Sequence, residues 1–413
     1  MATKCASSNL KDYIGSKEEA TIQTLATEIA ISPRFCNLVI QCSNAHEGTP
    51  FTDASITLKI VLETWYAMRT NYADGIPKFA FVRMEDILNA SVLDDFVADG
   101  VKGIEKCNKC IKQSFLALLE FLRNKDHHEK AIQKLIKTNP SNNGCKKTCV
   151  MVALGQHLFS QLIPGKVYAV DKLAKHVPNK CSCGCKAEIS GGNTSVGASG
   201  TWHGRVDILL NETIAVAVLS RERDEEDEND ENDHDSDEDE PPIKQMKEDE
   251  CDVCMEEKTD AILLEHKVMN KILALAITNG FAQVNMHKGT LLDYMIPTFG
   301  ATSEHVTICL YDPENDILFH IKEELELWFG GTPEKLHVRT IFIIWLFLNF
   351  TAFTRRKLLD FIDLDKTGFH DQLKGYLNDY QNAKTQGQTI EPGSSAKVWK
   401  DIPGKDKKRK NQV

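Results

Sequence analysis

The sequence lacks an apolar segment long enough to cross a lipid bilayer. Its most hydrophobic stretch, Ile341 to Phe353, covers about 13 residues, whereas a spanning helix needs roughly 20. Met1 to Gly15 mixes Lys, Asp and Ser without the apolar core of a signal peptide. We therefore expect a buried helix at 341–353, no membrane attachment, and an intracellular protein, either nuclear or cytoplasmic.

The sequence also lacks the short motifs that mark several enzyme classes. There is no G-x-G-x-x-G after a strand, no G-x-x-x-x-G-K-[ST], no G-x-S-x-G and no H-E-x-x-H. Nucleotide-binding, serine-hydrolase and zincin functions are therefore not indicated. The chain has no internal repeat either.

The acidic balance of the chain comes from one segment. The formal net charge is −11, but Glu222 to Glu240 alone carries fourteen acids and one Arg, so the rest is close to +2. Because this run and the following Pro241-Pro242 contain almost no apolar residue, we expect a disordered insertion at 221–259. We favour a solvated tether over a binding site for cations or for a basic protein partner.

A second segment of biased composition ends the sequence. Past Gln386 the composition is that of a linker, and Lys405 to Lys410 is strongly basic. Such a tail resembles a nuclear-import signal or a phosphate-binding arm, so nucleic acid is a candidate partner.

The stretch Trp202 to Leu210, followed by Thr213 to Leu219, predicts a β-hairpin. Both segments are rich in aliphatic residues, and Asn211-Glu212 between them predicts the turn. The second strand contains no charged residue, so we expect it to be buried on both faces. Asp207 is the one acid in this hairpin, and its carboxylate either serves chemistry or pairs with a cation.

Helical periodicity dominates the N-terminal third and the C-terminal part. The clearest N-terminal pattern is Asp53 to Thr70, after a Thr52/Asp53 cap. Lys267 and Lys271 lie four residues apart on a predicted helix that Asn279-Gly280 should end. The other predicted helices are 84–95, 112–123, 128–138, 148–162, 261–278, 336–353, 357–363 and 369–381, and the other predicted strands are 294–299, 305–311 and 317–321.

These patterns predict an α/β protein with a mixed sheet flanked by helices. We divide the chain into a helical N-terminal domain (1–147), an α/β core (148–330), a helical C-terminal extension (331–384) and a disordered basic tail (385–413).

Cysteine and histidine spacing raises the question of a structural zinc site. Zinc prefers four thiolate or imidazole ligands, usually from two C-x₂-C pairs. C-x-C-x-C is an unusual spacing for zinc, so we favour separate reduced thiols over a structural zinc ion. The His127-His128 pair is interpreted as a solvated first helical turn rather than a metal site. The group considered for zinc comprises His176, Cys181, Cys183, Cys185, Cys251 and Cys254, with Cys107 and Cys110 or Cys145 and Cys149 as optional pairs.

The order of a helix, strands with Gly204-x-x-Asp207, a buried strand, a helix and a hairpin resembles the core of the restriction-endonuclease-like, or PD-(D/E)XK, nuclease superfamily. The resemblance covers about residues 148 to 321. It implies that Asp207 is the first acid of a site that holds one or two divalent metals, Mg²⁺ or Mn²⁺, for phosphodiester cleavage.

The second half of the superfamily motif, E-x-K on the next strand, is missing. Ala215 to Leu219 stands there, and a lone carboxylate leaves Mg²⁺ short of ligands. An acid supplied by Glu265 or by Glu222, the latter as a metal ligand, would be needed as a replacement. A lysine supplied by Lys267 or Lys271 would have to stabilise charge.

Three functions follow from these observations. The first is a metal-dependent nuclease that uses Asp207, Glu265 and Lys267. The second, which we favour, is a catalytically degenerate protein of the same fold that binds nucleic acid or protein. The third is a structural or interaction protein unrelated to nucleases, in which Asp207 only pairs with Arg205 or His203.

Overall fold

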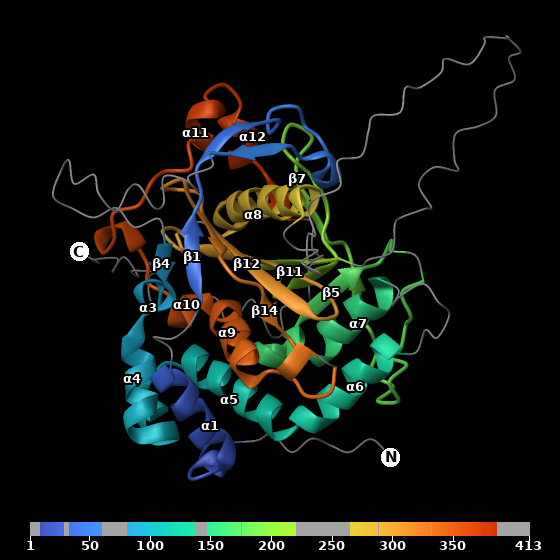
Figure 1. The fold of residues 1–413 in the computed structure, drawn as a ribbon, viewed down its shortest axis with the longest axis vertical. Helices are drawn as coiled ribbons and strands as arrows, with labels where there is room; N and C mark the ends of the chain where they lie inside the picture. Colours follow the sequence, from blue (N-terminus) through green and yellow to red (C-terminus); the bar gives the residue numbers. More distant parts are fainter. Residues whose placement is uncertain are drawn as a thin grey trace, which may run out of the picture.

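The structure of the chain is a computed structural model that describes residues 9–28, 33–59, 81–137, 147–219 and 265–385, apart from 175, 288 and 332. It is an α/β protein in which helices cover both faces of one large mixed sheet (Figure 1). This confirms the predicted architecture at that level. The expected acidic insertion, 221–259, and all but the first residue of the expected basic tail, 385–413, lie outside the described residues.

The large sheet has ten strands in the order β4-β1-β13-β12-β11-β10-β9-β5-β6, with β14 paired to β12. Predicted strands at 294–299, 305–311 and 317–321 correspond to β11, β12 and β13. The strands are β1 (Arg34–Asn37), β4 (Phe81–Arg83), β5 (Tyr168–Asp171), β6 (Gly191–Gly192), β9 (Ile208–Leu210), β10 (Ile214–Val218), β11 (Ile296–Ala301), β12 (His305–Asp312), β13 (Ile317–Ile321) and β14 (Leu325–Glu326).

Four strands form the centre of this sheet, together with two helices that pack on it. β5 follows α7 (Lys147–His157) in the chain, and β9 lies between β5 and β10 and pairs antiparallel with both. Then α8 (His266–Met286) crosses over, and β11 pairs parallel to β10. All five residues of β10 are buried, as predicted from the absence of charge in this strand.

Alternate side chains of β10 enter two different apolar clusters. Ala215 and Ala217 belong to the cluster under α8, and Val216 and Val218 belong to the cluster on the opposite face. The α8 face also carries α11 (Phe369–Gln372), α12 (Leu377–Gln381) and a small sheet of β15 (Lys384–Thr385), β7 (Ser195–Gly197) and β8 (Gly204–Arg205) (Figure 1).

The predicted end of α8 at Asn279-Gly280 is wrong, because the helix continues to Met286. Both residues are useful inside it. The Asn279 side chain donates a hydrogen bond to the carbonyl of Thr213 at 3.1 Å. A Cβ on Gly280 would lie 2.8 Å from the Tyr311 ring, so glycine permits the close approach of α8 to β12. Tertiary packing therefore outweighs the local stop signal.

The N-terminal region is not entirely helical, contrary to the sequence prediction. Two of its strands, β1 and β4, extend the large sheet, and β2 (Ile40–Ser43) pairs with β3 (Ile56–Leu58). The predicted helix 53–70 is therefore wrong at its start, where alternate burial favours a strand; residues 60–80 lie outside the described residues. The helices here are α1 (Lys17–Thr27), α3 (Met84–Ile87), α4 (Ala90–Asp99), α5 (Lys109–Arg123) and α6 (Lys125–Lys137).

The most apolar segment forms α9 (Val338–Leu348) and the single turn α10 (Phe350–Phe353), both buried against the sheet. Asn349 separates them. Its side chain accepts a hydrogen bond from Ser114 of α5 at 2.8 Å and donates one to the Leu162 carbonyl at 3.0 Å. The predicted helix at 357–363 is only the 3-10 turn Leu358–Asp360. Among the described residues no helix is both long and apolar enough to cross a membrane.

The buried His320 of β13 should make stability depend on pH. Its Nε2 lies 2.8 Å from the Thr307 hydroxyl, and burial lowers the pKa of His320 to about 4. Since the unfolded chain binds this proton near pH 6.5, the free energy of unfolding should fall as pH drops from about 6.5 to 4, by up to about 3 kcal/mol from this residue. Urea unfolding of His320→Gln should show a weaker pH dependence across this window, and the exposed His176→Gln should match the unaltered chain. Equal slopes for all three would contradict the assignment.

Candidate metal centre

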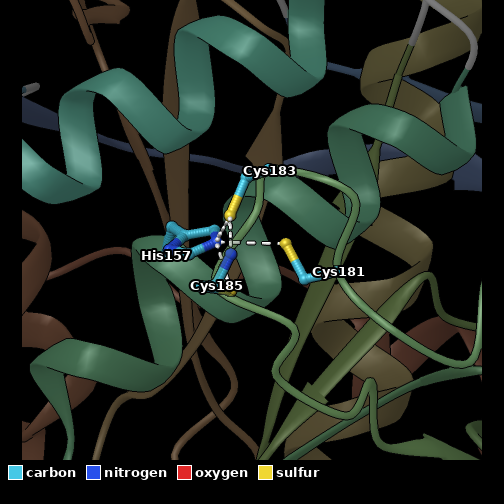
Figure 2. A group of neighbouring side chains, drawn as sticks. All are labelled: His157, Cys181, Cys183 and Cys185. Carbon is cyan, nitrogen blue, oxygen red and sulfur yellow. Dashed lines mark hydrogen bonds between the residues drawn. The ribbon is translucent and has the colours of Figure 1, made fainter. Parts of the chain in front are cut away.

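Four side chains bring one imidazole and three thiols together beside α7 (Figure 2). His157 is the last residue of α7, and its Nε2 lies 3.3 Å from the Sγ of Cys181. The same nitrogen lies 3.3 Å from the Sγ of Cys183 and 3.8 Å from the Sγ of Cys185. The four donor atoms all lie within 4.8 Å of one another. This group is the candidate metal centre.

The three cysteines converge because their loop, which joins β5 to β6, is folded back on itself. The Cys181 amide donates to the Ala187 carbonyl at 2.8 Å, and the Ile189 amide donates to the Asn179 carbonyl at 3.0 Å. Gly184 lies at the tip with φ of +111°, in the region that favours glycine. In an extended strand, next-but-one side chains share a face but are spread out. The turn at Gly184 brings their sulfur atoms together.

Neighbouring helices hold both halves of the centre. Lys134 of α6 donates from Nζ to the Cys183 carbonyl at 3.0 Å. On α7, the Gln156 side chain accepts a hydrogen bond from the Tyr168 hydroxyl of β5 at 2.6 Å. His157 is only 2 % exposed. The candidate metal centre therefore lies where the β5–β6 loop meets the C-terminal end of α7.

The donor set and its spacing fit a tetrahedral zinc ion. Typical bond lengths of about 2.3 Å to sulfur and about 2.0 Å to nitrogen place nitrogen and sulfur about 3.5 Å apart at the tetrahedral angle. The observed distances from His157 Nε2 to the three sulfur atoms are 3.3, 3.3 and 3.8 Å. One imidazole with three thiolates is a closed structural set that leaves no position for a substrate.

The protonation states of the ligands should make metal binding depend on pH. Burial lowers the pKa of His157 to about 4, so its imidazole is neutral at physiological pH. Burial raises the pKa of the Cys181 thiol to about 12. Since a metal ligand must be deprotonated, binding of a cation releases at least the proton of Cys181, and affinity rises with pH.

The sequence identified the three cysteines but not the histidine. His176, the histidine considered for the group, is exposed and lies in the turn after β5. His157 lies 24 residues before Cys181 and is joined to it only by packing. The clustering also runs against the expectation of separate thiols. Of the other cysteines considered, Cys107, Cys110 and Cys149 are not in the cluster, and Cys145, Cys251 and Cys254 lie outside the described residues.

Asp207 lies just before β9 and is satisfied on both carboxylate oxygens. Its Oδ1 is 2.8 Å from Lys147 Nζ, at the first residue of α7. Its Oδ2 accepts a hydrogen bond from the Val218 amide at 2.7 Å. Asp207 is 9 % exposed. The cation that meets it is thus Lys147 and not Arg205 or His203.

A second acid, Asp171 of β5, lies beside Asp207. The antiparallel register pairs Val170 with Ile208, which places Asp171 directly across from Asp207. The Asp171 amide also donates to the Asp207 carbonyl at 3.1 Å. The Asp171 carboxylate in turn accepts a hydrogen bond from Arg205 Nε at 2.7 Å. Two neighbouring acids therefore each have a cation of their own.

The other residues that the sequence proposed for catalysis are Glu265, Lys267 and Glu222. Glu265 is the N-cap residue of α8, without a side-chain capping hydrogen bond, and Lys267 is exposed in the first turn. Within the described part of the chain, no hydrogen bond or ion pair joins either residue to Asp207. Glu222 lies outside the described residues. On β10, the residue directly across from Asp207 is Ala217, which cannot bind a metal.

No family model matches the chain, and searches of curated proteins and of solved structures find no match.

Removal of one thiol should remove the metal. The chain should bind about one zinc ion, and Cys181→Ser should reduce the zinc content towards zero and lower the melting temperature, because three ligands hold zinc poorly. The exposed Cys42→Ser is the matched control and should leave both unchanged. Zinc content is measured by mass spectrometry of dialysed protein. Equal zinc content and melting temperature in the two variants would refute the metal centre.

Proposed function

We propose that this chain is a non-catalytic binding module with a restriction-endonuclease-like core and one structural zinc ion. The order α7, β5, β9, β10, α8 and β11, followed by the hairpin of β12 and β13, supports the first part. It repeats the order of elements on which the sequence resemblance rests.

The pairing of Asp207 is the observation that carries the proposal. A catalytic Mg²⁺ would have to share Oδ1 with the Lys147 ammonium group, which repels it, and Oδ2 with the Val218 amide. It would then find Ala217 on β10 and Leu219 just after it, where the superfamily has E-x-K. Mg²⁺ usually takes one or two carboxylates with waters and substrate oxygens, and it gives up its waters reluctantly. An acid that already has a cation and an amide is better suited to holding the fold.

The proposal for zinc has a separate basis. His157 with Cys181, Cys183 and Cys185 offers soft ligands, whereas Mg²⁺ and Mn²⁺ prefer oxygen. Zinc bound there would hold the long β5–β6 connection against α7. Because β5 carries Asp171, the same zinc would steady the sheet edge at which Asp207 lies.

A metal-dependent nuclease is the second candidate, and one observation favours it. Asp171 stands across from Asp207, and Lys147 lies where it could stabilise charge on a phosphate. On this alternative the two acids share Mg²⁺ or Mn²⁺, with Glu265 as an auxiliary acid and Lys267 as a further cation. The ion pairs of Asp207 with Lys147 and of Asp171 with Arg205 would first have to rearrange.

The two candidates make opposite predictions for Asp207→Asn. On the binding-module proposal, the substitution loses the ion pair and should cost about 2 kcal/mol of stability, while Mg²⁺ or Mn²⁺ leaves the melting temperature unchanged. A double-mutant cycle with Lys147→Met should show that most of this cost disappears when the lysine is absent.

A cleavage assay tests the nuclease alternative directly. Plasmid DNA and single-stranded DNA are each incubated with the chain in the presence of different divalent ions. The unaltered chain should cleave neither. A rise in melting temperature with Mg²⁺ that Asp207→Asn abolishes, together with metal-dependent cleavage, would establish the nuclease and overturn the binding module.

Charge favours a basic protein over nucleic acid as the partner. The acidic run begins at Glu222, four residues after β10 ends at Val218, and carries a net charge of −13. Such a charge would repel a phosphate backbone and attract a basic surface.

A lysine-rich peptide should therefore bind the full chain, and binding should weaken about tenfold as salt rises from about 0.05 to 0.3 M. A variant with the acids of 222–240 changed to Asn and Gln should lose this binding but keep its melting temperature. Fluorescence anisotropy measures the affinity of the chain for this peptide and for a duplex DNA whose charge is equal in magnitude and opposite in sign. Tighter binding of the DNA by the unaltered chain would reverse the choice of partner.

A further inference from the structure

Nδ1, the second ring nitrogen of His157, lacks a hydrogen-bond partner among the described residues. The imidazole meets the three sulfur atoms through Nε2, so the neutral ring carries its proton on Nδ1. That Nδ1 is buried and has no hydrogen-bond partner among the described residues. A buried N–H left without an acceptor costs about 1–3 kcal/mol. Metal-ligating histidines almost always give this N–H to a carboxylate, a carbonyl or water.

His128 of α6 also has a ring nitrogen that lacks a hydrogen-bond partner among the described residues. Its ring centre lies 5.8 Å from the ring centre of His157, and its own Nδ1 is also buried without a partner. The His128 ring stacks on Phe121 with centres 5.1 Å apart and planes 5° apart, which fixes its orientation. The residue is 8 % exposed. Two fixed rings therefore each present a buried nitrogen in one small region between α6 and α7.

The neighbouring His127 does not share these properties. Its ring centre lies 6.1 Å from that of His157, but the residue is exposed, so bulk water can satisfy its nitrogens. The sequence pair His127-His128 thus divides into one solvated residue and one buried residue. The prediction of a solvated first turn holds for His127 alone.

We propose that His128 is a positioning residue for the metal centre: through one buried water, it accepts the hydrogen bond that His157 donates from Nδ1. The water accepts from His157 Nδ1–H and donates to the lone pair of His128 Nδ1. Two hydrogen bonds of about 2.9 Å through a tetrahedral oxygen span about 4.7 Å. Ring centres 5.8 Å apart are compatible with this span.

This role rests on the proposed zinc ion and specifies how the chain controls it. The bridge fixes the His157 tautomer with Nε2 free, orients the ring toward the three thiols, and makes Nε2 a stronger base. Loss of such a partner typically weakens metal binding 10- to 100-fold. The ligands themselves stay the same.

The test compares zinc affinity in three single variants by competition with a chromophoric chelator. His128→Leu keeps the volume but removes the acceptor, so zinc affinity should fall about 10- to 100-fold. His128→Gln keeps a polar group and should retain zinc affinity within about threefold of the unaltered chain. His127→Ala is the matched control and should bind zinc like the unaltered chain. Equal affinity in His128→Leu and His127→Ala would overturn the role of His128.

Two further measurements separate this role from a general loss of structure. The visible spectrum of the Co²⁺-substituted protein should show the same tetrahedral site in all variants, because the four ligands are unchanged. In the unaltered chain, nitrogen NMR should find the His157 proton on Nδ1, slow to exchange and close to a long-lived water. A His157 proton on Nε2, or no bound water there, would overturn the proposal without any substitution. Failure of the unaltered chain to bind zinc would instead overturn the zinc centre itself, and the role of His128 with it.

Discussion

The burial of β10 on both faces is the constraint on which the rest of the structure depends. None of its five residues is polar, and each is buried, so apolar groups must cover both sides. On one side α8 supplies them, and its close approach requires glycine at 280. On the other side α7 and α9 contribute to the larger cluster. Asp207 lies across from the end of this strand, so its carboxylate must be satisfied where water is scarce.

Local patterns predicted the elements around β10 well and their long-range partners poorly. Strand β13 has the bounds expected from its aliphatic run, 317–321, because a tight turn precedes it. The predicted end of α8 at Asn279-Gly280 was wrong. The Asn279 side chain donates a hydrogen bond to the Thr213 carbonyl, a contact between distant parts of the chain that no local rule predicts. The same limit applies to the metal centre. Three thiols two residues apart are visible in a sequence, but His157 joins them only through the packing of a distant helix.

The acids near Asp207 show how two neighbouring carboxylates can each be balanced by a basic side chain of the same protein. In the resemblance, acids on neighbouring strands hold a divalent cation between them. Here Asp171 and Asp207 stand on neighbouring strands, and each meets a cationic side chain of the chain itself, Arg205 or Lys147. Such internal cations need no metal supply and are present whenever the chain is folded. The sequence argument identified Asp207 and its two possible uses, but not Lys147, the lysine that pairs with it.

Helix α7 contributes to both the Asp207 ion pair and the thiol cluster. α7 begins at Lys147 and ends at His157, so its two ends are about 15 Å apart along the axis. Its first residue neutralises Asp207, and its last completes the thiol cluster. A domain boundary placed inside α7 would therefore separate Lys147, which pairs with Asp207, from His157, which belongs to the thiol cluster. A shortened chain that starts even one residue later, at Thr148, leaves a buried carboxylate without its counter-charge, and one that starts after His157 also leaves three thiols without their imidazole.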